Sequence, residues 1–250
     1  MKGHPMDWNK ILNWKLLSGS HKFPGPDGGT CINEAAIVAA GFKYHAVSSA
    51  GDCPPCFSRV LSAYAITLND RLPDDRRQEL LMPFVTRLAG TADTPEIERQ
   101  RFDFIMLGLI QTVLPISLRG WNDDLAAECE RVQNYDEAIA AVNKLALDRA
   151  RVLALDLALA RALALARDLD RARALALALD LARARALALA LDRVLGLDLD
   201  LDRALALDRA AVSLLDGAIQ IGKQADPIDA GIVVGRLAKI RQLEMSEVGP

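Results

Sequence analysis

The sequence predicts an all-α protein, and three observations support this fold class. Outside the low-complexity tract, apolar residues recur at spacings of three and four in most segments, as on one face of a helix. Thr94 and Asn122, which belong to the residue types that cap helix N-termini, stand just before two of these segments. The tract at 145–210 consists mainly of Ala, Leu and Arg, which are strong helix formers. We therefore expect an N-terminal helical domain at 7–142, a repeat tract at 143–210 and C-terminal helices at 211–245.

The first part of the chain is expected to alternate helices with loops. A first helix is indicated by the helical spacing of Trp8, Ile11, Leu12, Lys15 and Leu16. A loop dense in Gly and Pro follows at 18–31, and further helices are expected at 33–40, 57–68 and 73–89. Large aromatic rings at loop edges anchor loops, so we expect 19–70 to form one compact unit around Phe23, Phe42 and Phe57.

A central core helix is expected to open at Thr94, with Pro95 in its first turn. Its body is almost wholly apolar, which predicts burial on every side; its residues are Phe102, Phe104, Ile105, Met106, Leu107, Leu109, Ile110, Val113 and Leu114. Asn122 predicts the start of a helix that carries Cys129. Two amphipathic helices are expected at 211–222 and 227–243.

The tract from Leu145 to Ala210 follows a strict alternation. Every odd position is Leu or Arg, and every even position is Ala, Asp, Val or Gly, with a superimposed 12-residue repeat. Alternation is the signal of a strand, but Ala and Asp are poor strand formers, so we favour a helix over a β-solenoid or disorder. An alternation of codons beginning with C and with G would give the same pattern without any folding purpose.

As a helix, the tract would place leucines on opposite sides of its axis, because residues two apart are turned by about 200°. A helix of this length would then expose apolar surface all around, which soluble monomers do not carry. Its charged residues interrupt every apolar run, so a membrane is not a suitable environment. We therefore expect the tract to fold back on other helices or to mediate self-association or binding of a protein partner.

The composition limits the classes of function. The formal net charge is −3, and neither nucleic acid nor an anionic membrane is indicated, because both require a basic surface. The N-terminus has no apolar run typical of a signal peptide. The four cysteines, Cys31, Cys53, Cys56 and Cys129, are therefore expected to be reduced thiols in a cytoplasmic protein.

Three segments carry a resemblance to a known group of sequences. They are GSHKFPGPDGGTCINEAAIVAAGF at 19–42, CPPCFSRVLSAYAITLND at 53–70 and LLMPFVTRLAGTAD at 80–93. The chain resembles an uncharacterised family of bacterial hypothetical proteins in which this N-terminal region precedes an Ala-rich helical repeat. The resemblance implies a helical protein with a repeat and implies no activity.

Residues that could carry chemistry gather between 21 and 70. A metal site, with zinc as the candidate ion, would need about four ligands. His21, Cys31, Cys53 and Cys56 supply suitable atoms, with His45 as an alternative fourth ligand.

Two further interpretations of this region concern catalysis and anion binding. Cys53 and Cys56 have the spacing of a redox dithiol, and Cys56 lies near a helix start, which lowers the pKa of a thiol. Glu34 is a candidate general base beside His21 or the Cys56 thiolate. The Gly-rich segment 25–30 runs into a helix start, where backbone amides can bind an anion.

The bland interpretation of the same residues is that free cysteines are small buried hydrophobes and that isolated histidines have structural partners. On balance the sequence favours a cytoplasmic helical interaction or scaffold protein without a cofactor. The alternative is a metal- or thiol-dependent enzyme, or a zinc-stabilised module, that uses the cluster from His21 to Cys56.

Overall fold

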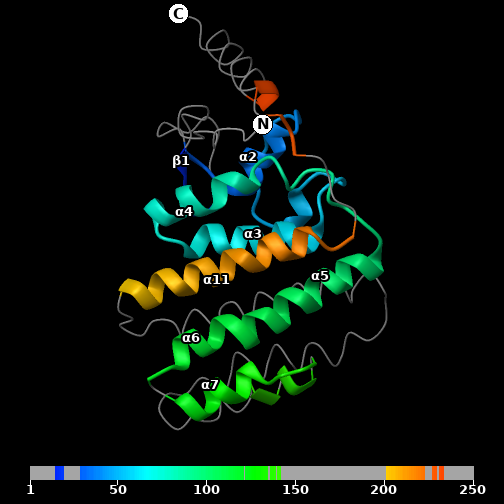
Figure 1. Ribbon diagram of the computed structural model, residues 1–250. Coiled ribbons are helices and arrows are strands. Elements are labelled where there is room, and N and C mark those ends of the chain that lie inside the picture. Colours follow the sequence, from blue (N-terminus) through cyan, green and yellow to red (C-terminus); the bar gives the residue numbers. More distant parts are fainter. Residues whose placement is uncertain are drawn as a thin grey trace, which may run out of the picture. The chain divides into compact units, whose positions relative to one another are not determined.

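The computed structural model confirms an all-α fold (Figure 1). It describes residues 15–19, 29–120, 122–134, 136–138, 140–141, 201–222, 227–229 and 231–233. Within these ranges the strands are confined to one parallel pair, in which β1 (Lys15–Leu16) lies beside β2 (Gly29–Thr30). Most of the tract at 145–210 and most of the helix expected at 227–243 lie outside the described residues.

The chain divides into two compact units that differ from the ranges expected from the sequence. One unit comprises residues 1–98 and 215–250, and the other comprises residues 99–214. The division falls inside two helices, α5 (Pro95–Gly108) and α11 (Leu201–Ile219), so each of them contributes to both units.

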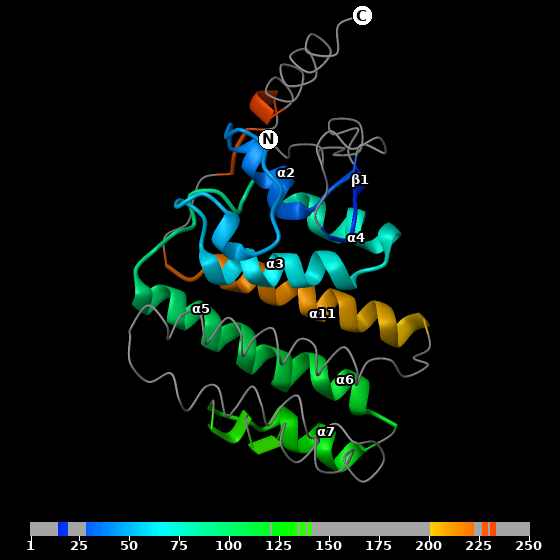
Figure 2. The ribbon, with the colours of Figure 1, turned by 180° about the vertical axis from the view of Figure 1, so that it is seen from behind.

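The first unit contains helices that follow the predictions closely. α2 (Ile32–Ala39) packs on α3 (Arg59–Arg71), which in turn contacts α4 (Asp74–Leu81), as Figure 2 also shows from behind. The Ser58 side chain caps α3 by accepting a hydrogen bond from the Leu61 backbone N–H at 3.1 Å. The core of this unit is formed by fully buried side chains that include Leu16, Ile32, Ile37, Phe57, Leu61, Leu81 and Leu88.

The prediction of a helix through Lys15 and Leu16 was wrong, because both residues belong to β1. The backbone N–H of Leu16 donates to Gln78 Oε1 at 2.8 Å, and its carbonyl accepts from Arg77 Nη1 at 3.3 Å. These partners lie far along the chain on α4. Local spacing could not reveal them, and they hold the backbone extended where the apolar pattern alone favoured a helix.

The helix expected at 73–89 is shorter than predicted. α4 ends at Leu81 and a 3₁₀ turn, η2 (Met82–Phe84), follows it. Pro83 explains the change, because proline has no backbone N–H and its ring clashes with the carbonyl four residues earlier in an α-helix.

In the second unit, α5 is followed without a break by a π-helical turn, η3 (Leu109–Val113), and by α6 (Leu114–Leu118). The sequence did not predict the π-turn. Pro115 lacks the N–H that would bond to the Gln111 carbonyl in an α-helix, and a wider turn before it accommodates this loss.

The expectation that the central helix is buried on every side was wrong for Phe104, which is 40% exposed. Its neighbours Phe102, Ile105, Met106, Leu109 and Ile110 are buried, as predicted. The stretch Pro95–Leu118 is long and apolar enough to cross a membrane by length and composition alone. However, 61% of its most apolar window is buried within the protein, as in the core helix of a soluble protein.

Of the two remaining helices, α7 begins where the sequence predicts and α11 begins earlier than predicted. Asn122 caps α7 (Asp123–Glu130) by accepting a hydrogen bond from the Leu125 N–H at 3.0 Å, which confirms that prediction. α11 begins at Leu201, inside the tract, rather than at 211. The helical prediction is therefore confirmed for the last ten residues of the tract, 201–210.

Candidate functional site

Residues 42–57, between α2 and α3, form an Ω-loop: a compact surface loop whose two ends lie close together. The rings of Phe42 and Phe57 close it edge to face, with centroids 6.5 Å apart and an interplanar angle of 62°. Phe57 is buried, and its segment forms an isolated bridge to Ala89. Within the loop the regular structure is limited to one 3₁₀ turn, η1 (Ala50–Asp52). We call residues 42–57 the Ω-loop below.

Glu34, the candidate general base, anchors this loop from inside. Its side chain is fully buried on α2. One carboxylate oxygen accepts the backbone N–H of Val47 at 3.0 Å, and the other accepts the N–H of Cys31 at 2.9 Å and the Thr30 hydroxyl at 3.2 Å. A buried carboxylate that binds three donors supports the fold here, since the two backbone N–H groups have no other partner among the described residues, whereas the Thr30 hydroxyl also reaches the Cys31 carbonyl at 3.2 Å.

Arg59, at the start of α3, holds the second half of the Ω-loop. Its Nη1 donates to the carbonyl oxygens of Ala50 and Cys53, each at 2.5 Å. The His45 ring lies between two further backbone carbonyls, with Nε2 at 2.6 Å from Asp52 O and Nδ1 at 3.3 Å from Lys43 O. His45, the alternative metal ligand, therefore makes contacts that fix the loop backbone.

Asp52 closes the turn within the Ω-loop through four hydrogen bonds to a single carboxylate oxygen. Oδ2 accepts the N–H and the hydroxyl of Ser48 at 3.0 and 2.9 Å, and those of Ser49 at 2.8 and 3.1 Å. These bonds, with the Ser48 hydroxyl as the largest contribution, hold the pKa of Asp52 below its ordinary value. One oxygen of the exposed Asp52 carboxylate is thus bound within the loop, and the group keeps its negative charge.

Two neighbouring side chains of the Ω-loop face solvent. Phe42 is 41% exposed, although its ring edge contacts Phe57. Lys43 is exposed, and its ammonium group has no hydrogen bond or ion pair with any residue that the structure describes. The loop therefore presents, at consecutive positions, an exposed aromatic ring and a cation without a partner in the described part of the chain.

The four cysteines do not form a common site. All four are free thiols, and Cys31, Cys53 and Cys129 are buried while Cys56 is half-buried. The structure places Cys31 as the N-cap of α2, where its sulfur accepts the Glu34 N–H at 3.4 Å. Sequence reasoning missed this role because cysteine is not among the usual capping residues.

Burial sets the reactivity of the thiols. It is the largest cause of a raised pKa for Cys31, to which the neighbouring charge of Glu34 adds. Burial is also the largest cause of a raised pKa for Cys53, and the nearby charge of Arg59 opposes it to a smaller extent. Cys56 lies in a turn before the Ser58 cap of α3, near a helix start as predicted.

The predicted metal ligands are not gathered within the described part of the chain. No three His, Cys, Asp or Glu side chains among the described residues lie where they could hold a metal ion. Cys31, Cys53 and Cys56 therefore do not supply three ligands to one centre, and His21 lies outside the described residues.

The backbone N–H groups at the start of α2, which were expected to bind an anion, already have hydrogen-bond partners within the protein. The N–H of Cys31 donates to Glu34, that of Ile32 to Asn69 Oδ1 at 3.2 Å, and that of Glu34 to the Cys31 sulfur. A bound anion would compete with these contacts and would lie beside the Glu34 carboxylate. Residues 25–28, the rest of the proposed cradle, lie outside the described residues.

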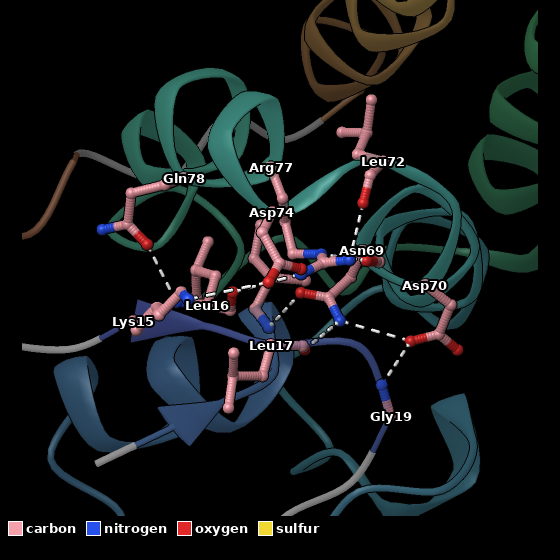
Figure 3. Close-up of polar contacts among 11 residues, drawn as sticks. Lys15, Leu16, Leu17, Gly19, Asn69, Asp70, Leu72, Asp74, Arg77 and Gln78 are labelled. Carbon is pink, nitrogen blue, oxygen red and sulfur yellow. Dashed lines mark hydrogen bonds and ion pairs between the residues drawn. The ribbon is translucent and has the colours of Figure 1, made fainter. Parts of the chain in front are cut away.

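A second buried polar network lies at the other end of α3 and fixes β1 (Figure 3). The Arg77 guanidinium donates to the carbonyls of Asn69, Leu16 and Leu72 and forms an ion pair with Asp74 at 2.6 Å. Asn69 Nδ2 donates to the Leu17 carbonyl at 2.7 Å, as Figure 3 shows. These side chains are committed to backbone groups, so the network supports the fold rather than a ligand.

The comparisons with known proteins do not indicate a function for this chain. No protein family, no curated protein and no solved structure matches this chain. The resemblance to a family of bacterial hypothetical proteins thus stays a prediction.

Proposed function

We propose that this protein is a helical interaction or scaffold protein that uses its Ω-loop as a recognition surface. The observation that carries the proposal is the contrast between the inside and the outside of this loop. Glu34 and Arg59 fix its backbone from within, whereas Phe42 and Lys43 point an aromatic ring and an unpaired cation toward solvent.

A loop held in this way is suited to binding. Long connections without regular structure are uncommon in compact domains, and those that are ordered are often functional. A surface fixed before binding loses less conformational entropy when a partner arrives, so more of the contact energy contributes to affinity. Of the candidate residues, Glu34, the proposed general base, binds the Val47 N–H, and Cys31, a proposed metal ligand, caps α2.

A second candidate role, self-association through the helical tract, is favoured by α11. Leu201 is 70% exposed, whereas Leu207 on the same helix is only 8% exposed. The alternating pattern thus places tract leucines both toward and away from the protein, as its geometry predicts. We propose that the leucines directed outward contact a second copy of the chain, and that the protein acts in the cytoplasm.

The alternative of a zinc-dependent site gains no support from the residues that the structure describes. Elemental analysis of the purified full-length protein tests the zinc site directly. Stoichiometric zinc would support a site formed by residues between His21 and Cys56.

Cross-linking in cells that express the full chain tests the interaction proposal, because Lys43 is itself a reactive amine in the Ω-loop. We expect cross-links from Lys43 to other proteins, and we expect Phe42→Ser to reduce them. Lys15 is the matched control, since it is exposed but paired with Asp74 at 3.6 Å outside the loop. Cross-links at Lys43 no more frequent than those at Lys15, or unchanged in the Phe42→Ser protein, would overturn the proposal.

A further inference from the structure

We propose that the Ω-loop binds a protein segment in which a carboxylate stands next to a large apolar side chain. Phe42 provides the apolar contact and Lys43 the cationic one. This inference rests on the proposed function and adds the chemistry of the partner.

Phe42 is the exposed apolar side chain of the Ω-loop. Among the described residues, four large hydrophobic side chains are exposed: Phe42, Phe104, Leu201 and Ile232. Single exposed apolar residues are common and need no explanation by themselves. Phe42 differs from the other three because it belongs to the Ω-loop, where its contact with Phe57 holds the ring in place. A fixed aromatic ring at the surface has the properties of an interface anchor, since little side-chain entropy is lost on binding.

The charged groups of the Ω-loop and of the residues that bind it determine the partner's charge. The Ω-loop carries Lys43 and Asp52, and its backbone is bound by Arg59 and by the buried Glu34. Asp52 is engaged by four donors, and the Arg59 guanidinium donates to carbonyl groups rather than to a carboxylate. The ammonium group of Lys43 therefore remains without a hydrogen-bond or ion-pair partner among the described residues. The complementary group is a carboxylate, which would also fix the register of an apolar neighbour on Phe42.

A peptide segment fits this surface better than a nucleic acid does. Binding to a phosphate backbone relies on several cations along a groove, whereas the loop carries one lysine, Lys43, and the nearby Arg59 already donates to loop carbonyls. The whole chain also has a formal net charge of −3, which opposes a polyanion. One lysine beside one aromatic ring matches a single acidic residue beside a single apolar one.

The test is a selection of random linear peptides, displayed on phage, against the immobilised full-length protein. We expect the selected peptides to share an Asp or Glu within a few positions of an aromatic residue or Leu. The synthetic form of a selected peptide should bind Phe42→Ser roughly tenfold or more weakly, the loss typical of an interface anchor. Selection against Lys43→Glu should enrich Lys or Arg in place of the acidic residue.

Lys15→Glu is the matched control, because it reverses an exposed lysine outside the Ω-loop and should leave the selected peptides unchanged. Urea unfolding of each variant shows whether the fold is kept. Selected peptides without a shared acidic residue, or with the same affinity for Lys43→Glu, would overturn the inference. Lys43-dependent binding of a fluorescent single-stranded RNA, with no peptide enriched, would overturn it as well.

The failure of this inference can be distinguished from the failure of the proposed function. Specific cross-links at Lys43 in cells together with failed peptide selection would leave an interaction protein whose partner has other chemistry. Lys43 cross-links no more frequent than those at Lys15 would remove the proposed function itself, whatever the phage selection yields.

Discussion

The buried carboxylate of Glu34 accepts the backbone N–H of Val47 at 3.0 Å, and this bond joins α2 to the middle of the Ω-loop. Its second oxygen satisfies the Cys31 N–H, so one side chain holds both the loop and the first turn of the helix. The relationship explains why an acidic residue can lie in an apolar interior: its burial is compensated by backbone N–H groups that have no other partner among the described residues.

Replacement of Glu34 by Ala should destabilise the protein by about 2–4 kcal/mol, because buried donors of the loop and the helix start would be left unsatisfied. Urea unfolding at neutral pH measures the change. The matched control is Glu79→Ala, which removes an exposed glutamate from α4 and should change the free energy of unfolding by less than about 0.5 kcal/mol. Equal effects of the two substitutions would show that Glu34 does not anchor the loop.

Glu34 also shows how far the sequence predicts the fold and the site. Caps at Thr94 and Asn122 and the Pro95 start are local signals, and the two helices that depend on them, α5 and α7, were confirmed. The type of Glu34 suggested a general base, but its partners lie elsewhere in the structure. The role of Glu34 depends on its hydrogen bond to Val47, 13 residues along the chain, and no local sequence pattern indicates that bond.

Contacts between residues distant in the sequence also explain where the sequence predictions were wrong. Leu16 is extended because Gln78 and Arg77 bind its backbone, which spacing around Leu16 cannot reveal. The Ω-loop was expected only as a loop with aromatic edges, and the contact of Phe42 with Phe57 agrees with that expectation. The four hydrogen bonds to Asp52 Oδ2, and the lack of a partner for the Lys43 ammonium group among the described residues, could be found only in the structure.

Alkylation should modify Cys56 well before the other three thiols. Cys56 is half-buried, whereas Cys31, Cys53 and Cys129 are buried, and burial both blocks the reagent and raises the pKa of Cys31 and Cys53. A time course with iodoacetamide at neutral pH, read by peptide mass spectrometry, measures the order. In concentrated urea the four rates should converge. Modification of Cys129 as fast as Cys56 in the native protein would contradict the described burial.

Asp52 should make the stability of the protein sensitive to acid. Its pKa in the folded protein is held below the ordinary value of 3.8, first by the Ser48 hydroxyl and then by backbone N–H groups. A carboxyl group with a lowered pKa stabilises the fold above its unfolded pKa, and this contribution is lost as pH falls through the folded pKa. Below about pH 4, Asp52→Asn should therefore lose less stability than the unmodified protein does.

The measurement for Asp52 is a series of urea unfolding curves between neutral and acidic pH. Asp75→Asn is the control, because Asp75 lies on the exposed first turn of α4 and has no hydrogen-bond partner among the described residues. A curve for Asp52→Asn that parallels the unmodified protein through the acidic range would show that the Ser48 and Ser49 contacts do not form in solution.

Self-association of the full chain should depend on protein concentration. Leu201 at the described end of the tract is 70% exposed, and burying one such side chain contributes about 1.5–3 kcal/mol. If many leucines of the tract are placed similarly, a second copy would gain a large apolar contact. Sedimentation equilibrium should show a mass above that of one chain at micromolar concentrations. A single monomeric species up to high micromolar concentration would argue against self-association.

Gly108 is required by the close approach of α5 to α11 in the second unit. A Cβ atom at this position would lie 2.3 Å from Leu214 Cδ2, well inside van der Waals contact. The backbone at Gly108 is ordinary right-handed helix, with φ −62° and ψ −37°, so alanine would be favoured there by about 1 kcal/mol on propensity alone. The contact with Leu214 should outweigh this gain, and we expect Gly108→Ala to destabilise the protein by about 1–3 kcal/mol.

A double-mutant cycle separates the two effects at Gly108. Leu214→Ala removes the side-chain atoms that the new methyl group would meet, at the expense of a buried leucine. In the Leu214→Ala protein, Gly108→Ala should therefore cost less than in the unmodified protein, and the helix propensity of alanine should make it close to neutral. Urea unfolding of the four proteins gives the interaction energy directly. An effect of Gly108→Ala that is the same in both backgrounds would mean that Leu214 does not pack against Gly108.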